Sequence, residues 1–181
     1  LLLMQTSGED SAGRIAEISE ICTAHGATFV YHVEDPHEGD MLIEVRRKVW
    51  PAFEHLGKAM LPEDVAVPRD RLPELLAGIT DIAERNQVML PTIGHAGDGN
   101  MHPLLVFDGQ DAEEVARVKV AFGEIVALAL SLDGTIAGEH GVGTLKKPFI
   151  ELELDPIQLQ VQRSMRTLLD PHGRLNPGKA I

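Results

Sequence analysis

The sequence contains only one cysteine, Cys22, among its 181 residues. One cysteine can form neither an intrachain disulfide nor a cysteine-based metal cluster. Any bound metal would therefore need histidine and carboxylate ligands. The lack of disulfide-forming cysteines agrees with a reducing compartment, so we expect a cytoplasmic protein.

Basic side chains and long apolar runs are also scarce. Lysine and arginine number 16 against 28 aspartate and glutamate residues, so the formal charge is 16 − 28 = −12. This sign argues against nucleic acid as a partner. Residues 122–132 are a long apolar stretch, but they include Gly123 and Glu124 and fall short of the ~20 residues of a membrane span. We expect no membrane span and no signal peptide.

The chain is long enough to bury one sizeable core and too short to favour two. We therefore expect a single domain over residues 1–181. The chain begins within an apolar run, at residues 1–6, and has no initiator methionine or polar lead-in. This start is typical of a chain cut from a longer protein.

Helical periodicity recurs along the chain. Asp10 or Ser11 can cap a helix in which Ile15, Ile18 and Ile21 recur at three-residue spacing. Further helices are predicted at residues 41–56 (perturbed by Pro51), 72–87, 111–132 and 156–169, the last opened by Asp155 and Pro156.

Strands are predicted at residues 1–6, 27–33, 88–94 and 101–107, with an extended segment at 64–68. Only the loop 94–100 separates the last two strands, which favours antiparallel neighbours over a doubly wound parallel sheet. We therefore predict an α+β fold, a ferredoxin-like antiparallel sheet packed against helices, with a C-terminal helical segment.

The first motif that could bind a ligand or act in catalysis joins two predicted strands. Its sequence is Gly94-His95-Ala96-Gly97-Asp98-Gly99-Asn100-Met101-His102. A tight glycine-rich loop can bring its two ends side by side, so that His95 and His102 bind one divalent ion. Alternatively, the histidines cap the end of a sheet and bond to backbone. The nearby Asp98 and Asn100 weigh against that interpretation.

A second motif, residues 133–143, places four glycines around Glu139 and His140. Two imidazoles and one carboxylate are a common catalytic metal set that leaves coordination positions open. His95, His102 and Glu139 are therefore candidate ligands, and His140 a candidate acid or base. The alternative is a helix C-cap and a turn, with Glu139 and His140 simply solvated.

Together, residues 94–103, 134–143 and 176–179 resemble the C-terminal domain of FAD-linked oxidases. This group includes glycolate oxidase D-subunits, D-lactate dehydrogenases and D-2-hydroxyglutarate dehydrogenases, within the vanillyl-alcohol oxidase superfamily. The three matches follow the family's order, and the resemblance spans nearly the whole chain. It implies oxidation of a D-2-hydroxy acid to the 2-oxo acid by hydride transfer to FAD.

The resemblance also implies roles for individual residues. His95, His102 and Glu139 would hold a divalent metal, Zn or Mn, that grips the substrate carboxylate and hydroxyl, while His140 would take the hydroxyl proton. Arg46 or Arg47 would bind the substrate carboxylate, unless they form a solvated basic helix face. The positions implied to lie on the cofactor side are Asn100, Glu139, Gly141, Asn176 and Lys179.

Two positions separate this chain from the hydroxyglutarate-type relatives. Those relatives carry a lysine just before the segment matching 64–68 and an asparagine two residues beyond the second metal histidine. Pro62 and Leu104 stand there in this sequence. The difference favours the glycolate and lactate branch, with a less polar pocket.

The family's FAD-binding domain supplies most of the flavin contacts, and the 181 residues do not contain it, so we predict that the chain alone has no turnover. Expected partners are that domain, a small 2-hydroxy acid, and an electron-acceptor protein or quinone that would make the protein peripheral to a membrane. A homodimer is compatible with the sequence. The alternative function is a free-standing metal or small-acid binding module, or a subunit completed by a separate flavoprotein chain.

Overall fold

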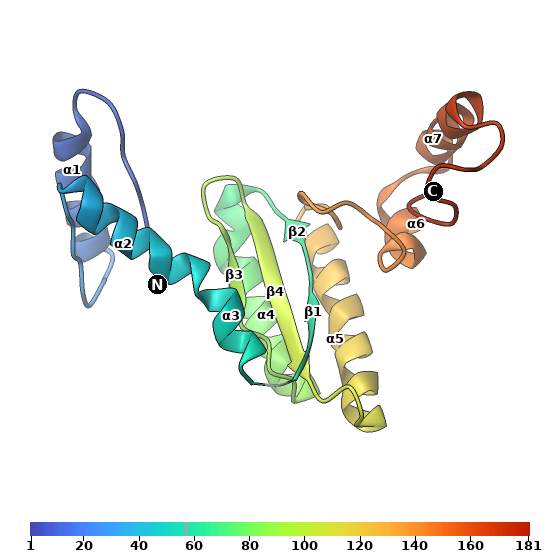
Figure 1. The fold of residues 1–181 in the computed structure, drawn as a ribbon, viewed down its shortest axis with the longest axis horizontal. Helices are drawn as coiled ribbons and strands as arrows, with labels where there is room; N and C mark the ends of the chain where they lie inside the picture. The colour runs from blue at the N-terminus through green and yellow to red at the C-terminus, as the bar shows by residue number, and fades with distance from the viewer. Residues whose placement is uncertain (57) are drawn as a thin grey trace. The chain divides into compact units, whose positions relative to one another are not determined.

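A computed structural model describes residues 1–56 and 58–181. The described chain forms two units, one of residues 1–56 and the other continuing to Ile181. Figure 1 shows the first unit in blue to cyan and the second in green to red. The predicted metal ligands all belong to the second unit, whereas Arg46 and Arg47 belong to the first.

The first unit is helical where the chain carries helix-starting and helix-stopping residues. The Asp35 side chain accepts a hydrogen bond from the His37 amide at 2.9 Å, so the second helix begins earlier than predicted. That helix is interrupted at Lys48, since Pro51 has no amide hydrogen to donate to the carbonyl four residues earlier. The helices are α1 (Ser11–Ala24), α2 (Pro36–Arg47) and α3 (Val49–Glu54).

The strands predicted at residues 1–6 and 27–33 are wrong. Both segments are irregular, and Phe29 and Tyr31 stack on each other with ring centroids 6.3 Å apart while remaining largely exposed. Aromatic and β-branched residues fit a pleated surface only where a partner strand supplies hydrogen bonds. Within the described part of the first unit, no strand offers that edge.

The second unit contains a four-stranded antiparallel sheet in which β4 is the central strand. β1 and β2 follow one another along one edge of β4, and β3 runs along the other edge. β1 was not predicted, because it is short and ends in a proline. The strands are β1 (Ala59–Pro62), β2 (Val65–Ala66), β3 (Thr92–His95) and β4 (Asn100–Phe107).

Helices α4 (Leu72–Asn86) and α5 (Ala112–Ser131) pack together on one face of this sheet (Figure 1). Apolar positions that recur at helical spacing in α4 and α5, including Leu75, Ile79, Phe122 and Ile125, lie in the buried core, whereas Ile15, Ile18 and Ile21 of α1 do not. The Asp111 side chain accepts hydrogen bonds from two amides of the first turn of α5 and so caps it. The predicted α+β fold is confirmed.

Side chains of β4 alternate between two faces of the sheet. Met101 and Leu105 join the core beneath the helices, whereas His102 lies on the opposite face. The rigid central strand therefore carries the core on one face and a candidate site residue on the other.

The C-terminal segment is helical, as predicted. The Asp155 side chain and Gln158 form a reciprocal capping box that opens the final helix. The elements here are α6 (Ile150–Glu153) and α7 (Pro156–Leu169), with short 3-10 turns at Lys147–Phe149 and, before α4, at Arg69–Arg71. Among the described residues, no helix combines the length and apolar character needed to cross a bilayer.

Candidate metal centre

The β3–β4 hairpin places His95 and His102 side by side. Ile93 pairs with His102, and His95 lies two residues further along β3, on the same face. The two imidazole rings meet almost at right angles, with centroids 5.4 Å apart. The glycine-rich loop thus brings its two histidines together, as the sequence predicts.

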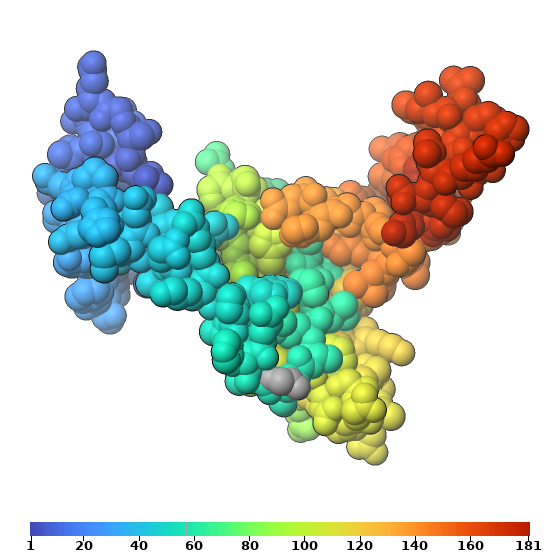
Figure 2. Space-filling model, in the orientation of Figure 1, coloured from blue at the N-terminus to red at the C-terminus, as the bar shows by residue number. Residues whose placement is uncertain are grey.

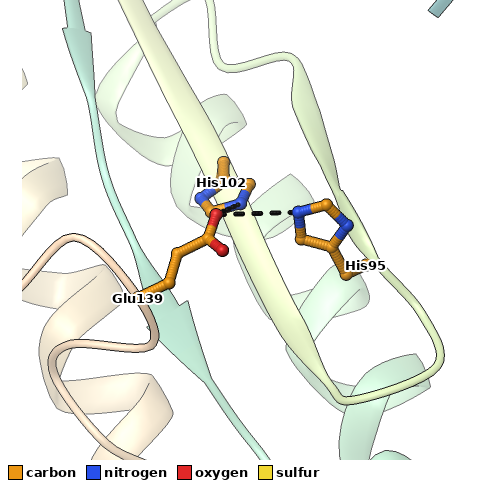
Figure 3. Close-up of side chains that lie close together, drawn as sticks. All are labelled: His95, His102 and Glu139. Carbon is orange, nitrogen blue, oxygen red and sulfur yellow. Dashed lines mark ion pairs between the residues drawn. The ribbon is translucent and has the colours of Figure 1, made fainter.

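Glu139 reaches this pair from the loop that follows α5 (Figure 3). Its Oε1 atom lies 3.0 Å from Nε2 of His102 and 3.6 Å from Nε2 of His95. One ligand atom from each of the three residues lies within 4.8 Å of the other two. Segments remote in sequence therefore converge on one small volume.

The donor set and its spacing fit a small divalent cation. Two ligand atoms bound at about 2.0–2.1 Å by a tetrahedral zinc ion stand about 3.3–3.4 Å apart. The separations of 3.0 and 3.6 Å between Glu139 Oε1 and the two imidazoles lie on either side of that value. These two separations are compatible with His95, His102 and Glu139 sharing one ion.

His140 lies next to the candidate ligands and is the most exposed of the four residues. Its Nε2 atom is 3.4 Å from Glu139 Oε1, and its ring centroid is 5.2 Å from that of His102. Its side chain is 66% exposed, against 14% for His102. The segment that carries Glu139 and His140, orange in Figure 2, lies at the surface of the second unit. His140 is therefore the member of the cluster most open to solvent.

Burial sets the protonation of His102. It lowers the pKa of His102 below its ordinary value of 6.5, and the negative charges of Asp64 and Glu139 offset only part of that effect. The imidazole is consequently neutral near pH 7 and has a lone pair to offer to a cation.

Asp64 is a buried carboxylate that the sequence analysis did not assign to the site. Its side chain accepts hydrogen bonds from the backbone amides of Glu139, at 3.0 Å, and His140, at 2.8 Å. Burial acts to raise the pKa of Asp64, but these two hydrogen bonds bring the pKa below its ordinary value. The carboxylate is therefore charged at neutral pH.

A buried ion pair lies beside Asp64. Lys146 Nζ is 2.7 Å from Glu63 Oε1, and the same ammonium donates hydrogen bonds to the backbone carbonyls of Asp64 and Ile136. Burial raises the pKa of Glu63 to about 7, with Lys146 offsetting part of the rise. The signal available in the sequence was two adjacent acidic residues inside an otherwise apolar extended segment, 61–67.

Four other predicted residues belong to the second unit but not to the cluster formed by His95, His102, Glu139 and His140; these are Asn100, Gly141, Asn176 and Lys179. Asn100 is buried, and its side chain lies against Gly138, next to Glu139. Gly141 has a positive φ of 75° and follows His140 in the same loop. Arg46 and Arg47 are exposed on α2, and Arg47 pairs with Glu44.

The tail residues Asn176 and Lys179 are exposed in a turn fixed to α7. The Arg166 guanidinium donates to the carbonyls of both residues, at 2.9 and 2.7 Å. The Ala180 amide donates to the carbonyl of Gly143 at 2.7 Å, which ties the tail to the end of the glycine-rich loop. The second motif and the tail motif are therefore neighbours in space.

Comparison with known proteins gives matches along the whole chain. The family described as FAD linked oxidases, C-terminal domain, matches residues 1–180. The chain is 37% identical to the glycolate oxidase subunit GlcD of Bacillus subtilis over 180 residues, covering 99% of this chain and 38% of that protein. It is 32% identical to the probable mitochondrial D-lactate dehydrogenase of Danio rerio, covering 97% and 36%. A D-lactate dehydrogenase of Archaeoglobus fulgidus is 35% identical, with 99% and 39% covered. The chain thus spans under two fifths of these relatives.

Proposed function

Because the chain belongs to the family of FAD-linked oxidase C-terminal domains, we propose that it forms the substrate side of an enzyme that oxidises a short D-2-hydroxy acid to the 2-oxo acid. The observation that carries this proposal is the convergence of three imidazole Nε2 atoms, from His95, His102 and His140, on one carboxylate oxygen of Glu139. The relatives named as a glycolate oxidase subunit and as D-lactate dehydrogenases support the substrate class.

His95, His102 and Glu139 would hold one divalent ion, Zn or Mn. When bound, such a cation attracts the carboxylate and hydroxyl of a 2-hydroxy acid and lowers the pKa of that hydroxyl. Burial keeps the imidazole of His102 neutral, so that it can bind a cation. The exposed carboxylate of Glu139 would be the third ligand. Arg46 or Arg47 would bind the substrate carboxylate.

His140 would accept the hydroxyl proton at Nε2. Its exposure and its position next to the ligands allow it to approach a substrate held there, and an imidazole is suited to proton transfer near pH 7. FAD, held mainly by a domain beyond these residues, supplies the acceptor for the hydride from the α carbon. The positions proposed to lie on the cofactor side are Asn100, Glu139, Gly141, Asn176 and Lys179.

The surroundings of His102 support a short or apolar substrate. Leu104 is buried on β4, two residues from His102 and therefore on the same face, and it pairs with Pro62 of β1. The two positions that separate this chain from hydroxyglutarate-type relatives thus lie opposite each other. Neither offers a charge to a second substrate carboxylate.

Metal analysis tests the ligand set directly. We expect close to one Zn or Mn per purified chain and its loss in the His95→Ala, His102→Ala double variant. The matched control is His172→Ala, which removes an exposed imidazole of the C-terminal turn. A wild-type chain that stays metal-free after incubation with either ion would contradict the proposed site.

Turnover tests the reaction class. The chain together with its FAD-binding domain should oxidise D-lactate or glycolate, and the chain alone should not. His140→Asn should abolish oxidation while leaving metal content unchanged. A chain that binds metal and 2-hydroxy acid but has no flavoprotein partner would instead support a free-standing binding module.

A further inference from the structure

Asp64 occupies the break between β1 and β2, where the edge strand along β4 is interrupted. Its residue is 3% exposed, yet it forms no ion pair with a lysine or arginine among the described residues. Its carboxylate instead accepts the backbone amides of Glu139 and His140, 75 and 76 residues later in the chain. A buried anion is thus used to fix the loop that carries a candidate ligand and the candidate base.

The Asp64 carboxylate also lies near the imidazole of His102. Asp64 Oδ1 lies 3.7 Å from Nδ1 of His102, the ring nitrogen that points away from Glu139. This Nδ1 atom is buried and has no hydrogen-bond partner among the described residues. Asp64 is therefore the acidic group placed to accept a proton carried on Nδ1.

We infer that Asp64 is a positioning residue for the metal centre, acting on two ligands at once. This inference rests on the proposed metal site. By accepting the two amides, Asp64 fixes the backbone from which Glu139 reaches the histidines. At 3.7 Å, Asp64 Oδ1 lies just beyond hydrogen-bonding distance of His102 Nδ1. On metal binding it would close this gap and accept Nδ1–H, which leaves the lone pair of Nε2 directed at the ion, an outer-shell role that carboxylates commonly take beside metal-bound histidines.

The surrounding contacts keep Asp64 in place. Lys146 holds its backbone carbonyl and that of Ile136, so the strand break and the loop after α5 share one ammonium. Gly138 lies so close to Asp64 and Asn100 that a Cβ atom there would overlap both side chains. The loop and the carboxylate are therefore in close contact at Gly138.

Zinc affinity of the full chain, measured by competition with a chromogenic chelator, tests the inference. In Asp64→Asn, the side-chain carbonyl can still accept the two amides, but the amide group then donates to His102 Nδ1 and forces the proton onto Nε2. We expect an affinity loss of about 10–100-fold. The matched control is Asp81→Asn, which removes the same charge from an exposed position on α4 and should leave affinity unchanged.

A spectroscopic readout separates positioning from a general structural effect. In the zinc-bound wild-type chain, 15N-edited NMR should show His102 protonated on Nδ1. Equal zinc affinity in wild type and Asp64→Asn, with both folded by circular dichroism, would overturn the inference while leaving the proposed metal site intact. A wild-type chain that binds no zinc would instead overturn the proposed site.

Amide exchange in the metal-free wild type covers the case in which Asp64→Asn does not fold. The amides of Glu139 and His140 should exchange at least 10-fold more slowly than that of Gly141, which is exposed in the same loop. Equal exchange rates for these three amides would refute the hydrogen bonds from the Glu139 and His140 amides to Asp64, whatever the outcome with zinc.

Discussion

Replacing Gly138 by alanine tests the packing that brings Glu139 to the histidines. A Cβ atom added at Gly138 would stand 2.6 Å from Cγ of Asn100 and 2.8 Å from Oδ1 of Asp64. Non-bonded heavy atoms pack best at about 3.5–4.0 Å, so one of the partners must move by about 1 Å. Asn100 and Asp64 are 6% and 3% exposed and cannot swing into solvent. Overpacking of this kind costs about 1–3 kcal/mol.

Gly97→Ala is the matched control, because it makes the same chemical change in the nearby β3–β4 turn. A Cβ atom at Gly97 would meet no described heavy atom within 4 Å, and Gly97 does not have a positive φ. Its free energy of unfolding should stay the same or rise by up to about 1 kcal/mol, since alanine reduces the entropy of the unfolded chain. The difference between the two variants therefore isolates the overlap at Gly138.

Urea titration followed by far-UV circular dichroism is the appropriate assay. The only tryptophan, Trp50, and the only tyrosine, Tyr31, lie in residues 1–56, so intrinsic fluorescence reports on the wrong unit. We expect Gly138→Ala to be less stable than Gly97→Ala and to bind zinc more weakly, because the displaced loop carries Glu139. Equal stability and equal zinc affinity in the two variants would refute the close approach of Gly138 to Asp64 and Asn100.

Two further predictions concern the buried groups of the second unit. Burial raises the pKa of Glu63 above its unfolded value of 4.5 to about 7, so the stability that its carboxyl contributes is complete below pH 4.5 and is lost as pH rises through 7. The free energy of unfolding of wild type relative to Glu63→Gln should therefore fall by about 3 kcal/mol between pH 4.5 and 8, measured by urea titration, and a flat difference would contradict the raised pKa. Leu75→Ala empties a fully buried position of α4 and should cost about 2–5 kcal/mol, whereas Leu76→Ala, at a position 40% exposed, should cost under about 1 kcal/mol in the same assay. Equal losses in the two leucine variants would show that α4 buries a different face.

Helices were predictable where local sequence decides them. α4, α5 and α7 follow from apolar periodicity and from caps such as Asp111 and Asp155, which act within one turn. Strands depend on a partner that is distant in sequence. The runs at 1–6 and 27–33 have strand-like composition but no partner in the described first unit, whereas β1, which ends in proline, is a strand because β4 lies beside it.

The sequence indicated which residues form the candidate site, but not the contacts that hold Glu139 beside the two histidines. His95 and His102 are joined by a hairpin, so seven residues of sequence are enough to bring them together. The approach of Glu139 depends instead on contacts spanning about 75 residues, through Asp64, and on Lys146 behind it. A buried acid that accepts backbone amides leaves no pattern of spacing in the sequence. Two adjacent acids in an apolar segment were the only sign of it.

Mutations in the core beneath His102 and mutations at the loop that carries Glu139 should have different effects. His102 belongs to β4, whose alternate residues Met101 and Leu105 are packed beneath α4 and α5, so its position is as stable as the core itself. Glu139 belongs to an exposed loop, and near this residue Asp64 accepts the amides of Glu139 and His140 while Gly138 lies against Asp64 and Asn100. Loss of a core side chain should therefore lower stability before it lowers metal affinity. Loss of Asp64 should lower metal affinity first, because the loop can move while the sheet beneath it stays folded.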